Sequence, residues 1–247
     1  MNRYRTAIFD MDGTVLNTLP DLANGIRHAF AECKSTYPFT DADAAEFFGS
    51  GVHVAIMRAM LREQGASAGE LEIVGTPEGK ALTDPLDAQR ISALEQSYRA
   101  FYSAHNADLT DAYEGIMPLL KKLRAAGIMT AVVSNKPDKD CRKLAERYFP
   151  GGFDLCLGEK PETPRKPAPD MTLQVLRELN AAPEEAVYIG DSEIDLQTAV
   201  NAGLSCIMVT WGFRSGDFIR GKIAKMPSWP VRIVDTPEEI AGLLISA

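Results

Sequence analysis

Cysteine, histidine and excess positive charge are all scarce in this chain of 247 residues. Its four cysteines, Cys33, Cys141, Cys156 and Cys206, are widely spaced and form no Cys-x-x-Cys pattern. That spacing excludes a recognisable zinc knuckle or redox pair and predicts that the four thiols behave as small buried hydrophobic groups. The three histidines are too scattered for a His-x-x-x-His zinc site.

Long apolar runs and basic runs are also missing. No stretch approaches the roughly 18 apolar residues of a membrane span, and the first residues lead into a strand pattern rather than a signal-peptide core. The net charge is −8, and no basic run is interleaved with aromatic residues, which disfavours binding to nucleic acid. We expect a cytoplasmic monomer or homodimer that acts on a small molecule, with no nucleic-acid or membrane partner.

The composition is that of a globular protein, with 45% hydrophobic and 24% charged residues. Short apolar runs followed by turn residues predict strands buried on both faces, and helical patterns separate them. This alternation predicts an α/β fold with a doubly wound parallel sheet. The expected strands are Tyr4 to Met11, Ile128 to Ser134, Phe153 to Leu157, Ala186 to Gly190, Ser205 to Thr210 and Val231 to Val234.

One part of the chain breaks the alternation. Residues 17–109 have helical periodicity throughout, interrupted by the glycine- and proline-rich stretch Gly65 to Pro85, which is expected to be a long loop or a pair of turns. The sequence therefore predicts an α/β core domain of residues 1–16 and 110–247 and a helical domain of residues 17–109. Four basic residues of the helical domain are interpreted as surface residues rather than contacts to a substrate carboxylate: Arg27, His28, Arg58 and Lys80.

Two carboxylates, Asp10 and Asp12, follow the first expected strand in the run Asp10-Met11-Asp12-Gly13-Thr14. Ligands of open α/β sheets bind beyond the carboxyl ends of the strands, where this run lies. Like charges this close must share a proton or bind a cation, which is the environment of a nucleophile beside an acid/base group. The residue frequencies make a chance occurrence of this run improbable.

Three later segments bring further polar groups to strand ends. Ser134 and Asn135 end the second core strand, before an expected helix N-terminus, where anions are favoured. Lys166 lies between Arg165 and two prolines that restrict its backbone. Asp191 and Asp195 follow the run Ile189-Gly190, about one helical turn apart, and offer oxygen ligands of the kind that Mg²⁺ prefers.

In order and position these segments are similar to the four motifs of the haloacid dehalogenase-like hydrolase superfamily, and the resemblance covers essentially the whole chain. The helical insert resembles the cap of the subclass that contains phosphoglycolate phosphatases, β-phosphoglucomutases and small pyrophosphatases. The segments that carry the resemblance are Asp10-Met11-Asp12-Gly13-Thr14, Ser134-Asn135, Lys166-Pro167 and Gly190-Asp191-Ser192 with Asp195, together with Phe48-Gly49-Ser50-Gly51-Val52 and Leu19-Pro20-Asp21-Leu22 in the insert.

The resemblance implies a Mg²⁺-dependent phosphatase acting on a small phosphorylated metabolite through an aspartyl-phosphate intermediate. Asp10 would be the nucleophile, and Asp12 would protonate the leaving oxygen and then activate water. Mg²⁺ would be held by the carboxylates of Asp10 and Asp191 and by the backbone carbonyl of Asp12.

The remaining roles implied by the resemblance concern the phosphate and the surroundings of the metal. Lys166, Ser134 and Asn135 would hold the phosphate oxygens. Asp195 and Thr14 would support the metal through water or through its direct ligands. The helical cap would close over the site, with hinges near Val15 to Thr18 and Asn106 to Tyr113.

Several functions remain open on this core. We name 2-phosphoglycolate as the first substrate, with a phosphosugar mutase of the β-phosphoglucomutase type and a pyrophosphatase as alternatives. A different class, a catalytically silent binding or regulatory module, would normally lack the nucleophile or a metal ligand. Asp10, Asp12, Lys166 and Asp191 are all present, which disfavours that class.

Overall fold

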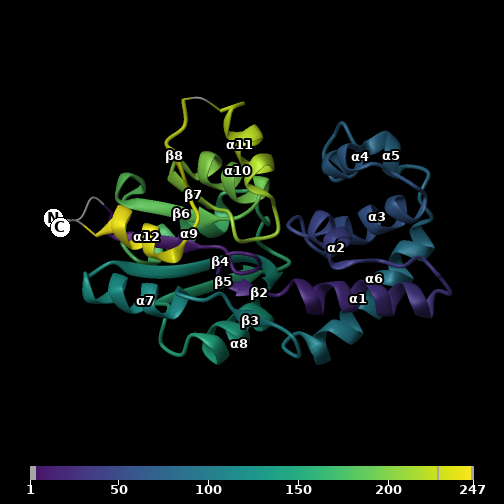
Figure 1. Cartoon of the computed structure of the whole chain (residues 1–247), viewed down its shortest axis with the longest axis horizontal. Coiled ribbons are helices and arrows are strands. Elements are labelled where there is room, and N and C mark those ends of the chain that lie inside the picture. The colour runs from purple at the N-terminus through teal and green to yellow at the C-terminus, as the bar shows by residue number, and fades with distance from the viewer. Residues whose placement is uncertain (1–3, 227, 246–247) are drawn as a thin grey trace. The chain divides into compact units, whose positions relative to one another are not determined.

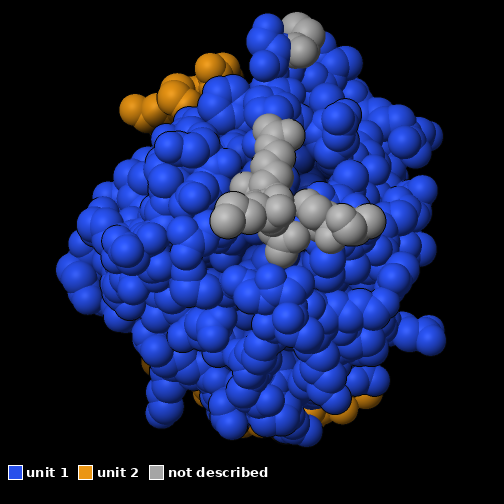
Figure 2. Space-filling view, turned by 90° about the vertical axis from the view of Figure 1, so that its left-hand side faces the viewer, with its two compact units in different colours: residues 1–17, 111–247 blue, residues 18–110 orange. Residues whose placement is uncertain are grey.

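The computed structural model describes residues 4–226 and 228–245 of the chain. It contains two compact units: Met1–Asn17 with Asp111–Ala247, and Thr18–Thr110 (Figure 2). These limits differ by one residue from the expected domain limits. Within the described residues, no helix is both long enough and apolar enough to cross a membrane.

The first unit is built on a sheet of six parallel strands in the order β5-β4-β1-β6-β7-β8 (Figure 1). This arrangement confirms the doubly wound α/β fold, with β1 in the interior of the sheet and later strands added on both sides of it. The strands are β1 (Thr6–Phe9), β4 (Met129–Pro137), β5 (Leu155–Glu159), β6 (Ala186–Gly190), β7 (Ser205–Val209) and β8 (Val231–Val234).

Helices cover both faces of this sheet. α9 (Asp170–Glu178) and α10 (Glu193–Ala202) pack on one face against a core that includes Ile8, Val133 and Tyr188. Figure 1 shows α7 (Ile116–Ala125) and α8 (Asp138–Tyr148) on the opposite side. Shorter elements complete the unit: the 3-10 helix Pro183–Glu185, α11 (Gly216–Ile223) and α12 (Pro237–Leu244).

The second unit is all helical, as its periodicity predicts. Its elements are α1 (Leu19–Glu32), α2 (Asp41–Phe47), α3 (Val52–Glu63), α4 (Ala68–Ile73), α5 (Lys80–Thr83) and α6 (Ala88–His105). The expected loop from Gly65 to Pro85 is wrong in part, because it contains α4 and α5. Ser67 caps α4, since its side chain accepts a hydrogen bond from the backbone N–H of Glu70 while the Glu70 carboxylate accepts one from the Ser67 N–H.

Arg58 lies inside this unit, so its interpretation as a surface residue is wrong. The residue is 2% exposed, and its guanidinium donates hydrogen bonds to backbone carbonyls of Phe47 (3.1 Å) and Val74 (3.3 Å). These carbonyls lie at the ends of α2 and α4, where no intrahelical donor remains for them. Arg58 therefore stabilises two helix ends.

The chain passes between the units twice, and in each unit the two connecting segments are hydrogen-bonded to each other or to the same side chain. β2 (Leu16–Asn17) and β3 (Asp111–Ala112) form a short antiparallel pair in the first unit. In the second unit, the buried carboxylate of Asp21 accepts hydrogen bonds from the backbone N–H groups of Leu109 (3.0 Å) and Thr110 (2.8 Å). The expected hinges coincide with these segments and stay a prediction.

Candidate active site

The neighbouring strands β1 and β6 bring Asp10 and Asp191 together. Phe9 pairs with Ile189, and the backbone N–H of Asp10 donates to the Ile189 carbonyl at 2.9 Å. Both strands are parallel, so their carboxyl ends meet at one edge of the sheet and the next residues, Asp10 and Asp191, lie close together there. Both are buried, with 8% and 1% of their surfaces exposed.

Lys166 joins this pair from the segment after β5. Its side chain is 2% exposed, and its Nζ atom lies 2.7 Å from Oδ1 of Asp10 and 2.8 Å from Oδ1 of Asp195. The side-chain amide of Asn135 holds the backbone of Lys166 by two hydrogen bonds: its nitrogen donates to the Lys166 carbonyl (3.0 Å), and its oxygen accepts from the Lys166 N–H (2.8 Å). Asn135 therefore positions the lysine, while its contact with phosphate stays a prediction.

Asp195 is part of the same cluster and also caps a helix. It lies at the third position of α10, and its Oδ2 accepts hydrogen bonds from the backbone N–H (3.0 Å) and the hydroxyl (2.7 Å) of Ser192. Its other oxygen faces Lys166. Both carboxylate oxygens thus have donors, and the side chain is fully buried. Asp195 fixes the lysine in front of Asp10.

Asp12 is paired with a second lysine, Lys136. Nζ of Lys136 lies 3.0 Å from Oδ1 of Asp12, and the Lys136 side chain is 2% exposed. The backbone N–H of Lys136 donates to Oγ of Ser134 at 3.1 Å, which anchors the end of β4. Lys136 was not predicted as a site residue, although it directly follows Ser134 and Asn135.

Asp191 is held by groups from two loops. Its Oδ1 accepts a hydrogen bond from Oγ1 of Thr14 (3.1 Å), and its Oδ2 accepts one from the backbone N–H of Phe213 (2.7 Å). Gly13 and Gly212 close around it, since a Cβ atom at either would lie 2.4 Å from Oδ2 of Asp191. The loop with Gly212 and Phe213 was missed, because a backbone donor leaves no motif in the sequence.

Burial and like charge perturb the titration of this cluster. Burial, then the charge of Asp195, raises the pKa of Asp10 well above its usual value, although Lys166 opposes the shift. The same two causes raise the pKa of Asp191 to about 7. Burial acts to lower the pKa of Lys166, but the attraction of Asp10 and Asp195 outweighs it, so the net shift is upward and the lysine stays charged.

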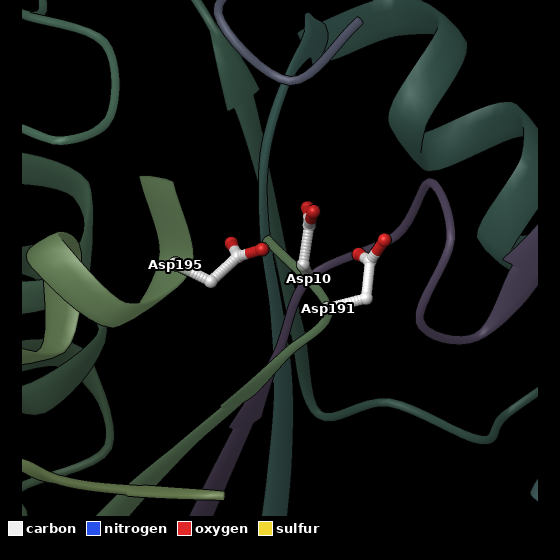
Figure 3. A group of neighbouring side chains, drawn as sticks. All are labelled: Asp10, Asp191 and Asp195. Carbon is white, nitrogen blue, oxygen red and sulfur yellow. The ribbon is translucent and has the colours of Figure 1, made fainter. Parts of the chain in front are cut away.

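The carboxylates are close enough to hold a metal ion. One oxygen each from Asp10, Asp191 and Asp195 lies within 4.8 Å of the others, and Figure 3 shows Asp10 between the other two. Hard divalent cations such as Mg²⁺ take oxygen ligands of this kind. The assignment of Asp10 and Asp191 as the ligands stays a prediction, as does the expected contact from the Asp12 carbonyl.

A parallel sheet with buried, perturbed carboxylates at its carboxyl edge defines an enzyme of the Rossmann-like α/β class. The family model described as haloacid dehalogenase-like hydrolase matches residues 7–209, which run from β1 to β7. The chain therefore belongs to the haloacid dehalogenase-like hydrolase family and is an enzyme of that family, as its motifs predict.

Named relatives cover most of the chain. It is 33% identical over 208 residues to a phosphoglycolate phosphatase of Cereibacter sphaeroides, covering 84% of this chain and 85% of the relative. A phosphoglycolate phosphatase of Psychrobacter arcticus is 31% identical over 216 residues, with 86% of each chain covered. The crystal structure of a protein from Lactobacillus delbrueckii subsp. bulgaricus, provisionally named phosphoglycolate phosphatase, superimposes with a TM-score of 0.91 at 40% identity, covering 99% of this chain and 100% of that one.

Proposed function

We propose that this enzyme is a Mg²⁺-dependent phosphatase that hydrolyses a small phosphomonoester through a phosphorylated Asp10, and that 2-phosphoglycolate is its substrate. One observation carries the chemistry: Asp10 and Asp12 lie two residues apart, yet each is paired with a different buried lysine. Their environments differ, which allows one carboxylate to attack while the other transfers protons. The names of the relatives support the choice of substrate.

The first step transfers the phosphoryl group to the protein. An oxygen of Asp10 bonds to phosphorus, the bond between phosphorus and the ester oxygen breaks, and Asp12 donates a proton to that leaving oxygen. In the second step Asp12 accepts a proton from water, the water oxygen bonds to phosphorus, and the Asp10 carboxylate is released with inorganic phosphate. Lys136, at the end of β4, holds the carboxylate of Asp12 during both steps.

The other residues of the site bind charge. Lys166 and the hydroxyl of Ser134 hold the nonbridging phosphate oxygens, and Asp195 and Asn135 keep the lysine in place. Asp10 and Asp191 would bind Mg²⁺, with Thr14 and Phe213 orienting Asp191. The bound ion would offset the repulsion between carboxylates and a phosphate dianion.

The helical unit of residues 18–110 is proposed to be the cap that excludes water and selects the leaving group. The crossing segments Leu16–Asn17 and Asp111–Ala112 would serve as its hinges. A panel of substrates tests which leaving group the helical unit selects, because mutases and pyrophosphatases of related architecture use the same core chemistry on other leaving groups.

The substrate is tested by measuring phosphate release from 2-phosphoglycolate, β-glucose 1-phosphate, pyrophosphate and nucleoside monophosphates. We expect 2-phosphoglycolate to have the highest kcat/KM. Asp10→Asn should reduce all turnover to background, whereas Asp217→Asn, at a fully exposed position of the same unit, should leave it unchanged. A higher kcat/KM for pyrophosphate, or formation of glucose 6-phosphate, would replace the proposed substrate by one of the alternatives.

The intermediate and the metal need separate tests. Borohydride reduces an acyl phosphate to the alcohol, so quenching during turnover should convert residue 10 to homoserine in the wild type. With p-nitrophenyl phosphate, whose leaving group needs no proton, Asp12→Asn should increase the trapped fraction, because the first step no longer needs its acid while water still reacts without its general base. EDTA should abolish turnover and Mg²⁺ restore it. Full activity without bound metal, or no trapped residue 10 in either protein, contradicts the corresponding part of the proposal.

A further inference from the structure

Two cysteines that are distant in sequence come together in the first unit. Cys141 lies on α8 and Cys156 on β5, and their sulfur atoms are 3.1 Å apart. Cys141 and Cys156 are free and buried, as expected, but the packing of α8 against β5 brings them into a contact that their spacing in the sequence does not indicate. Cys33 is not buried as expected, since it ends α1 half-exposed.

The two thiols differ in access to small molecules. Cys156 is 9% exposed and lines a surface cavity of about 320 Å³ between α8 and β5, together with Arg142, Phe149 and Phe153. Cys141 is completely buried behind it. A water molecule occupies roughly 30 Å³ in the liquid, so the cavity is large enough to hold a molecule of the size of hydrogen peroxide against Cys156.

We propose that Cys141 and Cys156 form a reversible oxidation site that reacts with small hydroperoxides and closes to a disulfide between α8 and β5. The Cys156 sulfur attacks one peroxide oxygen, the O–O bond breaks, and the products are a sulfenic acid and water. The Cys141 sulfur then attacks the sulfenic sulfur, and the hydroxyl leaves as a second water. The two sulfurs together lose two electrons, which the peroxide gains.

The order of these steps follows from the surroundings of the two sulfurs. The hydrogen bond with Cys156, and then burial, raise the pKa of the Cys141 thiol well above its usual value, so this group is a poor first nucleophile. It becomes effective once the neighbouring sulfur is a sulfenic acid in contact with it. A disulfide requires the sulfurs to approach by roughly 1 Å, to a bond length near 2.05 Å.

The fold already holds the two elements together beside this pair. The carboxylate of Asp138, at the start of α8, accepts a hydrogen bond from the backbone N–H of Gly158 on β5 at 2.9 Å. Closing the bond therefore needs only a local shift of side chains and the adjoining helix. The disulfide would enclose the short segment from 141 to 156, which restricts the unfolded chain and should raise the Tm.

The test treats the full chain, with EDTA present, with a small excess of hydrogen peroxide and maps the thiols by alkylation and mass spectrometry. We expect a 141–156 disulfide to form before Cys206 or Cys33 changes, the Tm to rise, and a dithiol reductant to reverse both effects. Cys206 is the matched control, since it is buried in the same sheet beside Met208 but has no cysteine neighbour among the described residues.

Variants separate the two roles. Cys141→Ser should leave Cys156 as a sulfenic acid that a dimedone probe labels, whereas Cys156→Ser should leave Cys141 unreactive and Cys206→Ser should form the disulfide normally. The wild-type map alone decides the outcome if a variant fails to fold. Oxidation of Cys156 to sulfinic acid without a disulfide, or earlier oxidation of Cys206, overturns the proposal. These readouts are independent of phosphatase activity.

Discussion

Replacing Lys166 by methionine should destabilise the first unit strongly. The ammonium group lies between two buried carboxylates, at 2.7 Å from Asp10 and 2.8 Å from Asp195, and its side chain is only 2% exposed. Methionine fills similar space but leaves both carboxylates without their cation. The matched control is Lys160→Met in the same loop, because Lys160 is 37% exposed and lies 4.0 Å from the carboxylate of Asp138.

The size of the effect follows from burial. Removing one partner of a buried ion pair costs about 3–5 kcal/mol, since the other charge stays desolvated. Two carboxylates lose their partner here, but the raised pKa of Asp10 allows it to take up a proton, which limits the loss to this range. An exposed pair contributes about 0–1 kcal/mol, so Lys160→Met should change little.

Urea unfolding of the metal-free protein measures this difference. Both tryptophans, Trp211 and Trp229, belong to the first unit, so their fluorescence follows that unit alone. With an m-value of roughly 3 kcal/mol/M, Lys166→Met should lower the urea midpoint by about 1 M or more. Lys166→Met combined with Asp195→Asn should lose less than the sum of the single changes, because the variants share one interaction. A midpoint equal to that of Lys160→Met would refute the assigned ion pairs.

Three further outcomes are expected. Gly13→Ala should abolish turnover and weaken Mg²⁺ binding measured by calorimetry, because the added Cβ would meet the side chain of Asp191. The control Gly127→Ala, also at positive φ but with open space around it, should stay active and lower the free energy of unfolding by only about 1 kcal/mol. Arg58→Met should destabilise the helical unit by about 2–4 kcal/mol, detected as faster hydrogen exchange in α2 and α4. As the pH falls below about 7, the pKa of Asp191, protons should compete with Mg²⁺ and weaken its binding. Over the same range, from pH 7 down to about pH 4, the metal-free protein should gain stability, because Asp191 binds a proton in the folded state while unfolded aspartate stays ionised. Asp191→Asn should remove this gain.

The site residues that directly follow a strand could be predicted from the sequence. Asp10 and Asp191 directly follow β1 and β6, and parallel strands bring their carboxyl ends to one edge whatever the exact twist of the sheet. Lys166 was placed in the site by its motif rather than by geometry. Its pairing with Asp195 depends on the path of the loop after β5, which local sequence patterns do not determine.

Other contacts needed the folded chain. Lys136 continues the run after Ser134, but only the longer course of β4 turns its ammonium group toward Asp12. In the helical unit, the glycines and prolines between residues 65 and 85 led to the prediction of a loop. The capping pattern of Ser67 and Glu70 is local and could have predicted the start of α4. The contact of Cys141 with Cys156 joins a helix to a strand and has no sequence signature.

The charges of the site explain why these positions must be occupied together. Four carboxylates face two ammonium groups, which leaves an excess of two negative charges (four minus two) in buried surroundings: Asp10, Asp12, Asp191 and Asp195 against Lys136 and Lys166. Such an excess is costly away from water and is relieved by a proton or by a cation. The raised pKa values of Asp10 and Asp191 show that protons can relieve the excess negative charge. A divalent ion would cancel the same charge without neutralising the nucleophile. In the proposed mechanism a phosphate dianion would then enter a site whose negative charge the cation has offset, whereas protonation would leave Asp10 neutral and unable to attack.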